Sequence, residues 1–218
     1  AVMVKLASTL RKYNWTVAVK GELQDDNFLC MEICDPADTA IVGCAIDIGT
    51  TTVTMVLTDL TTGKLLAKGS SGNGQIRYGA DVINRIIEQG KEGGKKKLQD
   101  AIIKETLTPI IANLCRSAGI SARSLLRLCV AANTTMNHLF VGVDAESVRM
   151  EPYIPSFFGW EGLLAGDLKL PANPLAPVLI APNIGSYVGG DITAGTLAAG
   201  FWDKDEMSLF IDLGTNGE

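Results

Sequence analysis

The chain has 218 residues, of which 47% are hydrophobic and 20% charged, and its formal net charge is −5. This composition is typical of a globular chain that can bury a core, and it excludes an intrinsically disordered protein. The acidic balance argues against nucleic acid as the main partner. Because no apolar run approaches the roughly 20 residues that a helix needs to cross a bilayer, we expect no membrane segment.

The five cysteines are scattered, odd in number and accompanied by no recognisable signal peptide, which predicts reduced thiols and a cytoplasmic protein. Cys30 and Cys34 form a C-x3-C pair whose sulfur atoms would share one face of a strand. A metal or cluster site is one interpretation, but no second such pair occurs elsewhere in the chain. A structural pair is the favoured interpretation.

The first 38 residues predict a small α+β unit. We expect a helix over residues 6–13, followed by strands over residues 15–19 and 28–33. The turn-rich stretch Asp35-Pro36-Ala37-Asp38 then marks a boundary. We interpret residues 1–38 as the end of a middle domain of a longer polypeptide.

The pattern changes after this boundary to that of an α/β layer with mixed strand directions. The expected elements are strands over residues 41–46, 53–58 and 64–68, helices over 78–89 and 98–114 with a kink at Pro109, a strand over 126–132, a short helix over 133–140, a surface excursion over 151–177, a strand over 178–180, a helix over 186–201 and a strand over 207–211.

Three meander strands followed by alternating helices and strands make up the ribonuclease-H-like plan. We therefore expect residues 39–206 to form a first ribonuclease-H-like subdomain. Residues 207–218 would supply the first strand and phosphate loop of a second, truncated subdomain. On this interpretation the chain is a piece of a longer protein.

One phrase occurs twice, each time directly after an apolar β-like run: Asp47-Ile48-Gly49-Thr50-Thr51-Thr52 and Asp212-Leu213-Gly214-Thr215-Asn216-Gly217. Glycine permits a tight turn and a close backbone approach, after which N–H groups and threonine hydroxyls can contact anionic oxygens. A carboxylate suits Mg²⁺ or the waters bound to it.

The doubled phrase therefore predicts a phosphate clamp with Asp47 and Asp212 as metal ligands. The residues expected to hold phosphates are Gly49, Thr50, Thr51, Thr52, Gly214, Thr215, Asn216 and Gly217. Two simpler interpretations stay open. An aspartate before glycine can merely cap a turn, and Thr51 and Thr52 also suit the start of a strand.

Five stretches together resemble the reductive activators of corrinoid proteins, which belong to the superfamily of actin, DnaK chaperones, hexokinase and acetate kinase. The stretches cover residues 47–52, 78–86, 133–138, 181–191 and 212–218. The resemblance implies an actin-like ATPase fold with ATP and Mg²⁺ as cofactors. It also implies that ATP drives the one-electron reduction of cobalt in a corrinoid iron-sulfur protein or corrinoid methyl carrier.

The same resemblance implies features that this chain does not contain. The family's two-iron ferredoxin-type cluster is expected only in an N-terminal region of the parent protein. The second half of the family's fold, with its adenosine-binding segment, would follow Glu218, so we expect this piece alone to bind nucleotide weakly and to be inactive. A homodimer is possible and the sequence does not decide it.

Asp191 precedes a glycine- and alanine-rich run similar to the DnaK-type helix whose leading acidic residue faces the metal. We expect Asp191 to orient water or act as a general base near the γ-phosphate, with a helix N-cap as the alternative. Gly190 would allow a close approach to the ligand, or it would simply turn the chain. Asn133 follows a buried strand, where either a ligand contact or a helix cap is expected.

Three other features stay undecided or favour packing. His138 is the only histidine and lies within a short helix, which favours a packing role. The polar set Tyr78, Asp81, Asn84 and Arg85 could face the cleft or a partner. Two rival functions also remain: a small-molecule kinase of the same superfamily, and a non-enzymatic partner-docking module switched by nucleotide.

Overall fold

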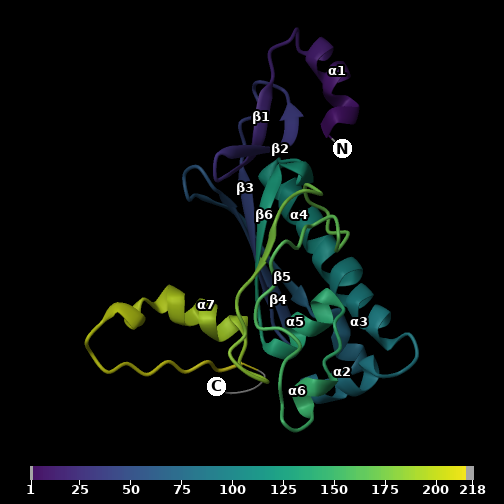
Figure 1. Cartoon of the computed structure of the whole chain (residues 1–218), viewed down its shortest axis with the longest axis vertical. Coiled ribbons are helices and arrows are strands. Elements are labelled where there is room, and N and C mark those ends of the chain that lie inside the picture. The colour runs from purple at the N-terminus through teal and green to yellow at the C-terminus, as the bar shows by residue number, and fades with distance from the viewer. Residues whose placement is uncertain (1, 215–218) are drawn as a thin grey trace.

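The computed structural model describes residues 2–214 and contains two separate β-sheets (Figure 1). An antiparallel pair, β1-β2, stands with helix α1 at one end of the molecule, and a mixed sheet has the order β5-β4-β3-β6-β7. The strands are β1 (Ala18–Gln24), β2 (Asn27–Cys34), β3 (Val42–Ile48), β4 (Thr52–Asp59), β5 (Leu65–Gly72), β6 (Leu125–Ala132) and β7 (Val178–Ile180).

The helical elements comprise α-helices and short 3₁₀ and π segments. The α-helices are α1 (Val2–Lys12), α2 (Val82–Gln89), α3 (Gly94–Ile102), α4 (Thr108–Ala118), α5 (Thr134–Val141), α6 (Glu146–Arg149) and α7 (Gly190–Ala199). The other helical segments are η1 (Gly74–Tyr78), η2 (Ile103–Leu107), η3 (Ala122–Ser124) and η4 (Phe201–Asp203). In the part of the chain that the structure describes, none of them is both long and apolar enough to cross a membrane.

The N-terminal unit follows the predicted order, but its first strand is displaced. Asn14 and Trp15 adopt positive φ angles of 49° and 65°, a left-handed conformation that ends helix α1 and cannot continue as a strand. Strand β1 therefore begins at Ala18 rather than at residue 15 as predicted. Lys20, buried at 3% exposure, pairs with Asp38 at 2.6 Å and ties this strand to the connection into the larger sheet.

The five-stranded sheet confirms a mixed α/β architecture. Strand β3 pairs antiparallel with β4 and parallel with β6, so that Ile46 lies opposite both Met55 and Val130. Strand β5 pairs antiparallel with β4, and β7 pairs parallel with β6. The three antiparallel strands expected from the sequence are all present. This order places the carboxyl ends of β3, β6 and β7 at one edge of the sheet, where parallel sheets bind ligands.

Helices cover one face of this sheet and leave the other more open (Figure 1). Side chains alternate along β3, so Ile46 and Ile48 enter the core while Ala45 and Asp47 face the open side. The predicted helical stripe packs against the covered face, and its buried members are Leu98, Ile102, Ile103, Leu107, Ile110, Ile111 and Leu114.

A π-helical turn, η2, splits the long helix predicted over residues 98–114. Pro109 lies in the first turn of α4, where its missing N–H is tolerated. The hydroxyls of Thr106 and Thr108 donate to the carbonyls of Ala101 and Ile103 at 2.8 Å each, and so satisfy acceptors that the wider turn releases. The expected break is therefore confirmed, and threonine side chains stabilise it.

The prediction for residues 151–177 was only partly right. This stretch carries no named helix or strand, as expected for an excursion. However, it does not stay on the surface, because Leu163, Ala165, Leu168 and Leu170 join the main hydrophobic core. An isolated bridge between Leu164 and Pro177 closes this loop. Apolar residues within a region rich in glycine and proline thus supply one wall of the core.

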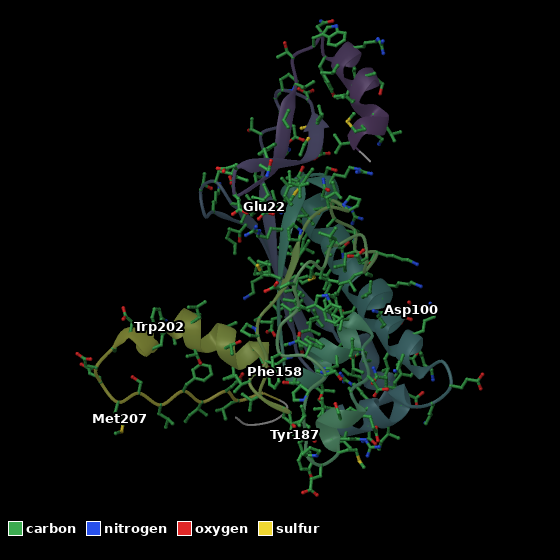
Figure 2. All side chains as sticks on the ribbon, viewed as in Figure 1. Glu22, Asp100, Phe158, Tyr187, Trp202 and Met207 are labelled. Atoms are coloured by element: carbon green, nitrogen blue, oxygen red, sulfur yellow. The ribbon has the colours of Figure 1, made fainter. Side chains whose placement is uncertain are left out.

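The C-terminal part corrects two further predictions. Helix α7 begins at Gly190 rather than residue 186, and with the chain after it forms an arm that projects from the body (Figure 1). Figure 2 shows Trp202 and Met207 at the tip of this arm. The strand predicted over residues 207–211 is absent, since this segment is extended but joins no sheet among residues 2–214. A strand needs a neighbouring strand for its backbone hydrogen bonds, and within the described residues this segment belongs to neither sheet.

Candidate functional site

The turn between β3 and β4 carries the first copy of the doubled phrase. Gly49 is required here for space, because an added Cβ atom would lie 2.5 Å from the carbonyl oxygen of Thr52. Strand β4 begins immediately afterwards at Thr52, as the strand-forming interpretation of the threonines allowed. The turn and the strand start are therefore compatible, and the glycine lets the backbone fold back closely.

Two side chains hold this turn from behind. Asn73 donates from Nδ2 to the Gly49 carbonyl at 2.9 Å, and its backbone N–H donates to the Thr51 carbonyl at 2.8 Å. Arg85 donates from Nη2 to the Thr50 carbonyl at 2.6 Å. Both side chains are buried, so three consecutive carbonyls of the turn are fixed from the protein interior.

Sequence reasoning gave Asn73 no role and left Arg85 undecided. The helix containing Arg85 buries Val82, Arg85, Ile86 and Gln89, a set with the spacing of one helical face. Ile83, which the apolar pattern grouped with Val82 and Ile86, is 37% exposed. A charged residue in phase with the buried face was the signal that could have singled out Arg85.

Asn133 serves both of the roles that the sequence left open. Its Oδ1 accepts a hydrogen bond from the Met136 N–H at 2.9 Å, which makes it the N-cap of α5. Its Nδ2 donates to the Thr50 hydroxyl at 3.2 Å. The cap residue of α5 therefore also contacts the phosphate-type turn.

Asp191 is not the N-cap of α7, since Gly189 occupies that position and makes no side-chain cap. Asp191 lies in the first helical turn and accepts from the Ile192 N–H at 2.9 Å. Gly190 is buried, and an added Cβ atom would lie 2.5 Å from the Ala181 carbonyl oxygen. Gly190 thus permits α7 to pack closely on the end of β7.

These elements surround a cavity of about 550 Å³. Nine residues predicted for the site line it: Asp47, Gly49, Thr50, Thr51, Thr52, Asn133, Asp191, Asp212 and Gly214. Helix α7 adds small residues that the sequence did not single out, namely Ala194, Gly195 and Ala198. Gly190 lies outside this lining, and Thr215, Asn216 and Gly217 lie outside the described residues.

Three carboxylates influence one another across the cavity. Burial raises the pKa of Asp47, and the charges of Asp191 and Asp212 raise it further. Although the cavity leaves Asp47 open to solvent, protein surrounds the carboxylate enough to disfavour its charge. Burial also raises the pKa of Asp191, with a smaller contribution from Asp212. The cavity therefore concentrates negative charge that a cation would stabilise.

Comparison with known proteins settles the family. The model of the RACo middle region matches residues 42–204, which include Asp47, Asn133 and Asp191. The chain belongs to the RACo middle region family. A corrinoid activation enzyme, RamQ of Eubacterium limosum, is 40% identical over 180 residues, or 82% of this chain and 30% of that protein.

A solved structure extends the comparison to nearly the whole chain. The reductive activator for corrinoid, iron-sulfur protein is 40% identical and superposes with a TM-score of 0.87 over 99% of this chain. The matched region is only 34% of the length of that longer protein. This RACo-family chain thus spans about a third of the length of the relatives it matches.

The oxygen donors of the RACo-family cavity suit Mg²⁺ only together with waters and phosphates. Among residues 2–214, no three histidine, cysteine, aspartate or glutamate side chains converge closely enough to hold a metal by themselves. Mg²⁺ commonly keeps several waters and binds through one or two carboxylates plus substrate phosphates. The elevated pKa values of Asp47 and Asp191 and the chemistry of the donors fit that mode, in which Asp47 and Asp212 would hold the ion.

Cys30 and Cys34 are free, half-buried thiols on β2. The Cys34 thiol contacts the Asp38 carbonyl at 3.7 Å, and burial raises its pKa. The structural interpretation of this pair therefore stays a prediction.

His138 packs rather than facing the cavity. Its Nδ1 donates to the Thr134 carbonyl at 2.7 Å, its Nε2 accepts from the Ser156 N–H at 3.0 Å, and its ring stacks on Phe157. Both nitrogens are therefore used by the neutral ring. Burial lowers the pKa of His138 below its ordinary value of 6.5.

We expect His138 to make this fold acid-sensitive. Because its pKa is lower in the folded than in the unfolded chain, its contribution is complete above pH 6.5 and is lost as pH falls toward the lowered value. Between the two pKa values, the free energy of unfolding falls by up to about 1.4 kcal/mol per pH unit. Urea unfolding at pH 7.5 and 5.5 should show a smaller pH effect in His138→Asn, and equal effects would contradict the assignment.

Proposed function

We propose that this chain is the part of a corrinoid-protein activator that binds ATP with Mg²⁺, and that the whole protein uses ATP hydrolysis to drive reduction of its partner. The observation that carries the proposal is the convergence of Asp47, Asp191 and Asp212 on one cavity beside the glycine turn. Membership of the RACo middle region family and the names of the two relatives support the corrinoid partner.

In this proposal each group acts on a different part of the nucleotide. The Gly49 turn and the second copy of the phrase hold phosphate oxygens, and Asn133 keeps Thr50 in place. Asp47 and Asp212 hold Mg²⁺, which neutralises charge on the phosphates. Asp191 orients the attacking water or accepts its proton, a role that suits a carboxylate whose pKa is raised.

We further propose that the fold is ribonuclease-H-like and actin-like. The strand order β5-β4-β3-β6-β7, with the first three strands antiparallel and the last two parallel, supports this proposal. Residues 39–206 would then be a first subdomain preceded by the end of a middle domain over residues 1–38. Residues 207–218 would begin the second subdomain.

The test is steady-state ATP hydrolysis by the full-length protein with and without an oxidised corrinoid iron-sulfur protein. We expect hydrolysis that the partner stimulates, because the proposed activity couples the two. A phosphorylated small-molecule product would instead support the kinase interpretation. Absence of turnover under both conditions would contradict the ATPase proposal and favour a docking module.

A further inference from the structure

We propose that Arg85 is a positioning residue of the candidate nucleotide site. Its buried guanidinium holds the phosphate-type turn from behind and places a positive charge under it, which favours ligands with more phosphate groups. The inference rests on the proposed function, because it concerns the same cavity. It goes beyond that function by assigning the source of polyphosphate preference to a residue outside the cavity lining.

Every described contact of the Arg85 guanidinium is to a neutral group. Nη2 donates to the Thr50 carbonyl at 2.6 Å and Nε to the Gly79 carbonyl at 2.9 Å. Nη1 lies 3.4 Å from Gln75 Oε1 and 3.3 Å from the Met136 sulfur. The side chain is 0% exposed, so water does not solvate this charge.

Arg85 makes no ion pair with any residue in the range 2–214 that the structure describes. The acidic group that acts on it is Asp81, whose exposed carboxylate instead caps α2 through Asn84 at 2.8 Å. Burial lowers the pKa of Arg85 to about 10, which leaves it charged at neutral pH. A buried charge without an opposite partner is unfavourable for folding, so its presence needs another explanation.

The position of Arg85 offers that explanation. Thr50 lines the cavity, while its carbonyl points back to the guanidinium, so one layer of backbone separates the cation from an anion in the turn. Across such a layer, in a partly dehydrated region, one unit charge changes anion affinity on the order of ten- to fifty-fold. The bond to Thr50 also orients the peptide group that follows, whose N–H belongs to the turn.

A purely structural role for Arg85 makes a different prediction. Asn73 provides the matched comparison, because it is buried and neutral and donates to the preceding carbonyl of the same turn, at Gly49. If Arg85 only supports the backbone, its loss and the loss of Asn73 should weaken ATP binding by similar factors, because each removes a hydrogen bond to the same phosphate-type turn. If its charge matters, the loss should grow with the number of phosphates.

The experiment is calorimetric titration of the full-length protein with adenosine, ADP and ATP in the presence of Mg²⁺. The variants are Arg85→Met, which keeps the length of the side chain without its charge, Arg85→Lys and Asn73→Ala. We expect Arg85→Met to lower the affinity for ATP on the order of ten- to fifty-fold. The affinity for ADP should fall less, and that for adenosine should change little. Arg85→Lys should recover most of the ATP preference, and Asn73→Ala should lower the ATP-to-adenosine affinity ratio by a much smaller factor than Arg85→Met.

An ATP-to-adenosine affinity ratio that falls no further in Arg85→Met than in Asn73→Ala would overturn the inference while leaving the proposed function intact. Failure of the wild-type protein to bind ATP would overturn the proposed function and the inference with it. If Arg85→Met does not fold, Arg85→Gln replaces it, since glutamine keeps an amide N–H donor for the Gly79 carbonyl at the position of Nε but carries no charge. The same ratio then decides.

Discussion

Replacing Asp47 with alanine should abolish ATP hydrolysis by the full-length protein, with turnover reduced by roughly a hundred- to a thousand-fold or more. Asp47 ends β3 directly before the glycine turn, lines the cavity and is acted on by the charges of Asp191 and Asp212. Without it, the proposed metal loses one of its two protein ligands.

The same substitution should not unfold the protein. Because burial and the neighbouring carboxylates raise the pKa of Asp47, its charged form is less favourable in the folded chain than in the unfolded chain at neutral pH. The unfolding midpoint of Asp47→Ala should therefore stay within a few degrees of the wild-type value. Asp26→Ala, at an exposed residue between β1 and β2, is the matched control and should hydrolyse ATP normally. Unchanged turnover in Asp47→Ala would contradict the Mg²⁺ assignment.

The parts of the fold that were predictable are those where local pattern and burial agree. The nearly continuous apolar run over residues 41–46 predicted strand β3, and the helical stripe from Leu98 to Leu114 predicted the residues that pack against the sheet. The failures arise from contacts distant in sequence. Residues 207–211 have the pattern of a strand, but a strand forms only beside another, which local pattern cannot reveal.

In the candidate site, too, the local motifs were predictable and the support from distant residues behind them was not. The doubled phrase predicted that Asp47 and Asp212 would meet although 164 residues lie between them, because two similar loops can serve one polyphosphate. The support behind the turn was not predicted. Asn73 and Arg85 are polar residues buried inside the fold, and residue type alone favours a surface position for both. The one local sign that Arg85 is buried is its helical spacing, which places it on the same face as Val82 and Ile86.

Asp191→Asn should lower the turnover number of ATP hydrolysis by about a hundred- to ten-thousand-fold and leave ATP affinity nearly unchanged. The structure places Asp191 within the first turn of α7 rather than at its cap, so the substitution removes no cap. Asparagine keeps the size of the side chain and an oxygen to accept from the Ile192 N–H, which donates to Asp191 Oδ1 at 2.9 Å in the wild-type chain. What it cannot do is accept a proton from water.

The thermal stability of Asp191→Asn distinguishes a catalytic role of Asp191 from a structural role in helix α7. A carboxylate that stabilised α7 would have a lowered pKa, whereas the pKa of Asp191 is raised despite its backbone hydrogen bonds. Its charge therefore opposes folding at neutral pH, and Asp191→Asn should unfold at the same temperature as the wild type or higher. A catalytic carboxylate is expected to show this combination of lost turnover and retained or increased stability. Parallel loss of turnover and stability would instead show that Asp191 serves the helix.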